Sequence, residues 1–103
     1  MEIIKSNREL THLTPEDLKA LISSLAMDIE FYYDNSRGAI CPINAKLIDI
    51  CFGDYNVPND RTDLECHSVD EVMTAKFIKG HSLTELCDKI LFDIWKNALE
   101  NRL

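Results

Sequence analysis

Apolar residues recur at helical spacing in two long stretches of this sequence. The first stretch carries Leu18, Leu21, Ile22, Leu25, Ile29 and Tyr32. The second stretch carries Leu83, Leu86, Cys87, Ile90, Leu91, Ile94 and Ala98. Steps of three and four place such side chains on one face of a helix. The pattern therefore predicts a first helix of about 18–20 residues that ends at the turn formers of 34–38, and a final helix over 83–98.

Three polar residues are placed to cap helices. Thr14 precedes a proline, which suits the first helical position because its missing N–H needs no partner there. Ser68 and Ser82 each stand three residues before a glutamate, which is the spacing of a capping box. Gly80 lies between the two serine-capped segments and suits the end of the first one. We therefore expect these two segments to form a helical hairpin at the end of the chain.

The middle of the chain fits two structures. Residues 44–53 have the pattern of a short helix, with Asn44 as its cap and Gly53 just after its last turn. The competing interpretation is a β-hairpin that pairs 46–52 with 61–67, because both segments also alternate between apolar and polar residues. We favour the helix.

Together these elements predict an all-α protein. A single compact domain over residues 1–103 would hold about four helices and end in the helical hairpin. The chain has 103 residues, of which 46% are hydrophobic, so it has enough apolar material for one core but is too short for two domains. The alternative fold is an α+β domain with a central β-hairpin at 46–52/61–67.

Acidic residues outnumber basic ones. The chain has 18 Asp and Glu against 11 Lys and Arg, which gives a net charge of −7 at pH 7. Affinity for a phosphate backbone comes mostly from Lys and Arg, so we expect no direct binding to nucleic acid. The charge is also focused. Residues 46–71 contain seven acids and two bases, whereas residues 72–103 contain four acids and five bases.

This acidic segment is the candidate partner-binding site. Turn formers over 54–60 predict a loop, and loops on a rigid scaffold often carry binding residues. Carboxylates around an aromatic side chain suit a basic protein partner. The candidate residues are Asp49, Asp54, Tyr55, Asp60, Asp63, Glu65, Asp70 and Glu71. The competing interpretation is a solvated loop whose charge serves only solubility.

From this distribution of charge we expect a small, non-catalytic binding protein that inhibits or neutralises a basic protein partner. Immunity proteins, antitoxins and proteins that imitate DNA act in this way, and a nuclease toxin is the kind of partner they cover; this is an analogy of class. The alternative is a homo-oligomeric structural or regulatory module that associates through the final helix. Phe92, Trp95 and Leu99 form a second apolar row there, which would make the contact of a homodimer.

The sequence offers no clear catalytic or metal site. His67 follows a cysteine, but adjacent side chains point to different sides of a helix or strand, and His12 and His81 have no evident partner. The cysteines contain no C-x2-4-C pair of the kind that starts a zinc site. They are Cys41, Cys51, Cys66 and Cys87. We therefore expect no enzymatic activity, no catalytic residue, no metal and no cofactor.

The N-terminal sequence indicates the compartment. The first twenty residues lack the apolar core of a signal peptide. No stretch approaches the ~18 consecutive apolar residues that a membrane span requires. We therefore expect a cytoplasmic protein with reduced thiols and no contact with a membrane.

Overall fold

The computed structural model describes residues 8–25, 27–54, 56–57, 59–96 and 98. Its strands are β1 (Arg8–Thr11), β2 (Ile29–Tyr33), β3 (Ser36–Asn44), β4 (Leu47–Gly53), β5 (Thr62–Cys66) and β6 (Leu91–Trp95). Its helices are α1 (Pro15–Ser24), α2 (Val69–Thr74) and α3 (Leu83–Leu86), and a 3-10 turn over Cys87–Lys89 follows α3.

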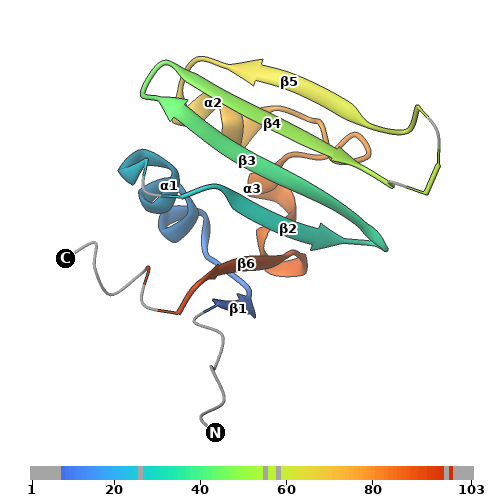
Figure 1. Ribbon diagram of the computed structural model, residues 1–103, viewed down its shortest axis with the longest axis horizontal. Helices are drawn as coiled ribbons and strands as arrows, with labels where there is room; N and C mark the ends of the chain where they lie inside the picture. The colour runs from blue at the N-terminus through green and yellow to red at the C-terminus, as the bar shows by residue number, and fades with distance from the viewer. Residues whose placement is uncertain (1–7, 26, 55, 58, 97, 99–103) are drawn as a thin grey trace, which may run out of the picture.

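The described strands form one antiparallel sheet with the helices against one of its faces (Figure 1). The strand order is β1-β6-β2-β3-β4-β5. The last strand of the chain therefore lies between the first two, and β2 to β5 follow as a meander that ends at the edge strand β5. The all-α prediction is wrong, because the sheet is the largest element of the structure.

The predicted first helix stops after ten residues. Leu25 adopts a left-handed φ of 58° that ends α1. In β2, Ile29 and Phe31 are buried whereas Glu30 between them is exposed, which is the period of a strand. The spacing from Leu25 to Ile29 also fits a helix, and this coincidence extended the predicted helix into β2.

The segment 44–53, predicted as a helix, is largely strand β4. It pairs with β3 on one side and β5 on the other. The hairpin of 46–52 with 61–67, which was the alternative, corresponds to β4 and β5, although they belong to a larger sheet. Ile50 and Phe52 are buried against the helices, and pairing with two neighbouring strands outweighs the local helix signal.

A two-residue turn connects β2 to β3. Asp34 and Asn35 both have left-handed φ values, 50° and 63°, as a type I′ turn requires. Asp and Asn tolerate this conformation better than other residues with a side chain. The turn fixes the register of the two strands, so that Phe31 lies opposite Gly38.

The predicted final helix over 83–98 is also wrong. The α3 helix has a single turn, and the 3-10 turn after it leads directly into β6. In β6, Phe92 and Ile94 are buried whereas Leu91 and Trp95 are exposed. This alternation fits a strand that packs one face on the core, so the predicted helical hairpin is replaced by α2, α3 and β6.

The predicted helix caps at Thr14, Ser68 and Ser82 are confirmed, whereas Asn44 ends strand β3 and caps no helix. The side-chain oxygens of Thr14, Ser68 and Ser82 accept hydrogen bonds of 3.1, 3.0 and 3.2 Å from the backbone N–H three residues later. Glu85 completes the capping box of α3 by accepting from the N–H of Ser82. The longest helix, α1, has 10 residues. None of the helices in the described part of the chain has the length and apolarity that a membrane span needs.

Phe31 lies at the centre of the core between the sheet and the helices. Its ring is stacked on Phe52 with centroids 6.0 Å apart and meets Phe77 edge-on at 6.2 Å. The ring of Phe92 lies 6.0 Å away on its other side. Opposite Phe31 on β3, a Cβ added to Gly38 would collide with the Phe31 ring. The glycine therefore makes room for the central aromatic ring.

We predict that Gly38→Ala destabilises the fold by about 1–3 kcal/mol, because the new methyl group has to displace Phe31 or the backbone of β4. Urea denaturation measures the change in the free energy of unfolding. The matched control is Ala39→Val on the opposite side of the same strand, for which we expect a change within about 0.5 kcal/mol. Equal stability of the Gly38→Ala variant and the wild type would contradict this account of the core.

We predict that Glu85 makes stability depend on pH in acid. Hydrogen bonds from His81 and from the Ser82 backbone lower the pKa of Glu85 from 4.5 to about 2. Because the pKa is lower in the folded state, the stabilisation is complete above pH 4.5 and is lost as the pH falls towards 2. Urea denaturation gives the free energy of unfolding of the wild type and of the Glu85→Gln variant between these pH values. The two free energies should become equal at the acid end of the range. A constant difference in free energy between them would refute the prediction.

Candidate protein-binding surface

One face of the sheet carries none of the described helices, and we call it the outer face. Its strand residues are Arg8, Leu10, Glu30, Tyr32, Arg37, Ala39, Cys41, Asp49, Cys51, Asp63, Glu65, Leu91, Asp93 and Trp95. In β2, β3, β4 and β6 these residues alternate with the ones that contact the core. The pleat therefore brings residues from distant parts of the sequence onto one surface.

Apolar side chains are exposed at one end of the outer face. Leu10 is 56% exposed, Trp95 43% and Leu91 38%. Arg8 places its guanidinium 4.9 Å from the centroid of the Trp95 ring and donates a 2.9 Å hydrogen bond to Asp93. These contacts hold the indole at the surface and leave much of it accessible. Exposed tryptophan and leucine side chains of this kind are typical of anchors in protein–protein contacts.

Carboxylates occur along the rest of the outer face. Two of its five acids form ion pairs at 2.9 Å, Asp93 with Arg8 and Asp63 with Arg61. No ion pair among the described residues engages the other three, which are Glu30, Asp49 and Glu65. The carboxylates of this face lie mainly on β4 and β5, which are three and four positions away from β6, the strand of Trp95, in the sheet order. The outer face therefore combines an apolar end with an acidic end.

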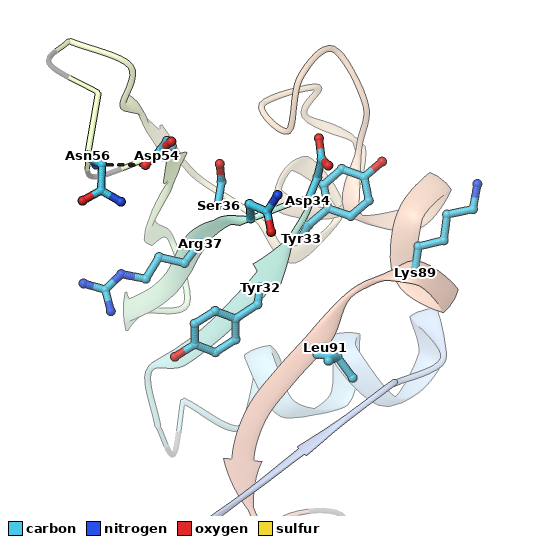
Figure 2. A pocket seen from close by; sticks show the side chains of 11 residues that line it. Tyr32, Tyr33, Asp34, Ser36, Arg37, Asp54, Asn56, Lys89 and Leu91 are labelled. Atoms are coloured by element: carbon cyan, nitrogen blue, oxygen red, sulfur yellow. Dashed lines mark hydrogen bonds between the residues drawn. The ribbon is translucent and has the colours of Figure 1, made fainter.

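A hollow of about 590 Å³ lies at the β2–β3 turn end of the outer face. Tyr32 forms part of it, and β-pairing places Leu91 on one side of Tyr32 and Arg37 on the other (Figure 2). Lys89 contributes a second cation to the lining. The Asp34 carboxylate, at the turn, binds Lys79 Nζ at 2.7 Å. The hollow thus presents an aromatic ring between an aliphatic side chain and a guanidinium.

The loop between β4 and β5 is organised by two of its own carboxylates. The Asp54 N–H donates to Asp60 Oδ2 at 2.8 Å, and the Asn56 N–H donates to Asp54 Oδ1 at 2.9 Å (Figure 2). These hydrogen bonds are typical of side chains that shape a turn. Asp54 and Asp60 therefore shape this loop.

A second hollow, of about 430 Å³, lies on the outer face beside β5. Cys41 and Cys51 line it together with Asp49 and Glu65. Burial, and next the charge of Asp28, raise the pKa of the Cys41 thiol to about 11. The thiol therefore stays protonated at neutral pH, which makes it a weak nucleophile. Cys41 and Cys51 act here as small apolar groups among carboxylates.

The structure separates the predicted partner-binding residues. Asp49, Asp63 and Glu65 lie together on the outer face. Asp70 and Glu71 lie instead in the first turn of α2, in the helix layer, because the chain crosses from β5 to the other side of the sheet. There Asp70 pairs with Lys19 at 3.2 Å, and Glu71 accepts from the N–H of His67 at 3.2 Å. Tyr55 lies outside the described residues. The negative charge of 46–71 is therefore not one patch.

The residues that were predicted to form a homodimer contact do not share one surface. Phe92 is fully buried in the core, whereas Trp95 faces the opposite side of β6. Leu99 lies outside the described residues. The helical spacing that grouped these residues does not apply to a strand. The period-two alternation of 91–95 was the signal that could have placed Leu91 and Trp95 on the outer face.

The three histidines have different partners. His12 Nδ1 donates to the Ile90 carbonyl at 2.7 Å, and His67 Nδ1 donates to the Lys46 carbonyl at 3.0 Å. His81 Nδ1 lies 3.3 Å from the Glu85 carboxylate. Among the residues that the structure describes, no three His, Cys, Asp or Glu side chains are placed to hold a metal ion. All four cysteines are free.

No protein-family model, curated protein or solved structure significantly matches this chain. The outer face and its two hollows are therefore the basis for assigning a function.

Proposed function

We propose that this protein is a non-catalytic binding protein that captures a basic protein partner on the outer face of its sheet. One observation carries the proposal. The outer face, which none of the described helices covers, exposes Trp95, Leu10 and Leu91 at one end and also carries carboxylates that have no ion pair among the described residues. This combination supplies both apolar contact area and electrostatic attraction.

The apolar end supplies most of the binding free energy in this proposal. The few interface residues that dominate binding are often Trp or Tyr side chains in well-desolvated positions, and truncating one of them costs about 2 kcal/mol or more. Trp95 is already positioned by its stacking on Arg8, so little conformational entropy is lost when it is covered. Tyr32 and the hollow beside it extend the same surface across β2 (Figure 2).

The acidic end supplies selectivity for basic partners and a fast association rate in this proposal. The net charge of −7 attracts basic proteins at long range and repels phosphate backbones and anionic membranes. Association should therefore be fast and sensitive to salt, while the release rate depends on the apolar contacts. A second copy of this chain carries the same charge, so it gains no such attraction.

Inhibition is the activity that such binding supports. The basic surface of a nuclease or another nucleic-acid-binding protein is the surface that contacts phosphates, so a protein that covers it excludes the substrate. The proposed compartment is the cytoplasm, where thiols such as the four free cysteines stay reduced.

We predict that neutralising the three outer-face acids without ion pairs weakens partner binding. The variant carries Glu30→Gln, Asp49→Asn and Glu65→Gln. Loss of three attractive contacts of roughly 0.5 kcal/mol each weakens binding about tenfold. Wild-type and variant proteins serve as baits in extract of the source organism. Captured proteins are identified by mass spectrometry, purified, and titrated calorimetrically at several salt concentrations.

The control removes the same charge from the helix layer through Glu16→Gln, Asp70→Asn and Asp88→Asn, which are all exposed positions. A basic protein that binds the wild type and this control equally, but the outer-face variant weakly, supports the proposal. Partners that bind all three baits with equal affinity would overturn it. Trp95→Ala tests the apolar end separately and should weaken binding by about 30-fold, the equivalent of about 2 kcal/mol.

A further inference from the structure

The β5 strand is an open edge of the sheet. It is last in the strand order and pairs only with β4 among the described strands. In an antiparallel ladder about half of the backbone N–H and C=O groups of such a strand point away from its neighbour. An edge of this kind is a template for a further strand.

Acidic and apolar side chains alternate along β5. Asp63 and Glu65 lie on the outer face, opposite Cys51 and Asp49 of β4. Leu64 points to the other side, next to the buried Ile50, and is 41% exposed. The apolar row on the core side of the sheet therefore reaches the edge without being covered there. The acidic row on the outer face also reaches the edge.

Both ends of the open edge are defined by local contacts. After β5, the Glu71 carboxylate accepts a 3.2 Å hydrogen bond from the N–H of His67, which directs the chain into α2. Before β5, Asp60 holds the loop by accepting from the N–H of Asp54. The five residues between these points are long enough to pair with a segment of similar length.

The other edge of the sheet differs. In β1 the Arg8 side chain binds both the carboxylate and the carbonyl of Asp93 at 2.9 Å, so its charge is directed inward across the sheet. Leu10 is the other outer-face residue of β1. Only β5 therefore combines, in the described sheet, an open edge with two outward carboxylates.

We propose that an extended basic segment of the partner adds to β5 as a seventh, edge strand of the sheet. This inference rests on the proposed function and specifies how the partner is held. Its Lys or Arg residues would lie beside Asp63 and Glu65, and the residues between them would be apolar and cover Leu64. Cross-strand pairs of opposite charge and apolar pairs both stabilise such a ladder.

A second copy of β5 fits this edge less well. If two copies paired antiparallel about Leu64, Asp63 of each would face Glu65 of the other, and like charges directly opposite are destabilising. If they paired about Asp63, the two copies of this residue would face each other. A basic strand avoids both conflicts, which is why the proposal commits to a basic partner.

The probe is the synthetic peptide Lys-Val-Lys-Val-Lys-Val-Lys, with blocked ends, and its affinity is measured by fluorescence anisotropy. One control has the same composition as Lys-Lys-Lys-Lys-Val-Val-Val, which cannot place charge and apolar groups on alternate sides. A second control methylates the backbone amides along one edge of the peptide, which removes ladder hydrogen bonds without changing its charge. A third control peptide carries the methyl groups on the backbone amides of its opposite edge.

We expect at least tenfold weaker binding of the block-sequence control and of one of the two methylated forms. Amide hydrogen exchange should slow at 62–66 when the alternating peptide binds. In the Asp63→Lys, Glu65→Lys double variant, preference should switch to the peptide Glu-Val-Glu-Val-Glu-Val-Glu. Because both side chains are exposed, the fold tolerates this change.

Strand addition is overturned if the alternating peptide fails to bind, if both methylated forms bind within twofold of it, or if the protected amides lie outside β5. The proposed function is tested separately by the natural partner and the Glu30, Asp49, Glu65 and Trp95 variants. If binding of the natural partner depends on those residues but amide exchange at 62–66 stays unchanged, strand addition is refuted. The outer face then remains the proposed binding surface.

Discussion

The contact between Phe31 and Gly38 determines how the sheet and helices pack. The ring fills the space that a side chain on β3 would otherwise occupy, and three other phenylalanines surround it. The type I′ turn at Asp34 and Asn35 sets the register that brings these two residues opposite each other. A shift by one residue would turn the apolar row of β2 to the outer face, so the turn and the core specify the same arrangement.

The described helices cover only one face of the sheet, because their apolar residues all belong to the same core. All three helices bury their apolar residues against the Phe31 side, and they form part of one continuous core cluster. The outer face therefore retains residues that none of the described helices covers, including Trp95 and Leu10. An antiparallel sheet tolerates one solvated face, which leaves this surface available for another molecule. In the proposed function, the acids on β4 and β5 select a basic molecule over an acidic one.

Three of the caps predicted from local chemistry were correct, whereas the helix that Asn44 was predicted to cap is strand β4, and predictions from long-range periodicity were wrong. Thr14, Ser68 and Ser82 cap helices because a cap needs only the next three residues. The stripe from Leu18 to Tyr32 failed because an apolar residue four positions after Leu25 fits a helix as well as the start of a strand. In the candidate site, Asp49, Asp63 and Glu65 lie together on one face because consecutive hairpin strands stay adjacent. Asp70 was grouped with them only by its position in the sequence.

The sequence by itself determined the helix starts, the negative charge and the segment in which most of that charge lies. These properties depend on composition or on contacts within one turn. Only the tertiary structure decided that β6 inserts between β1 and β2, and that Trp95 joins Tyr32, Leu91 and the β5 carboxylates on one surface. Pairing of strands distant in sequence makes this choice, because side-chain burial and ladder hydrogen bonds together outweigh the weak local preference of each segment.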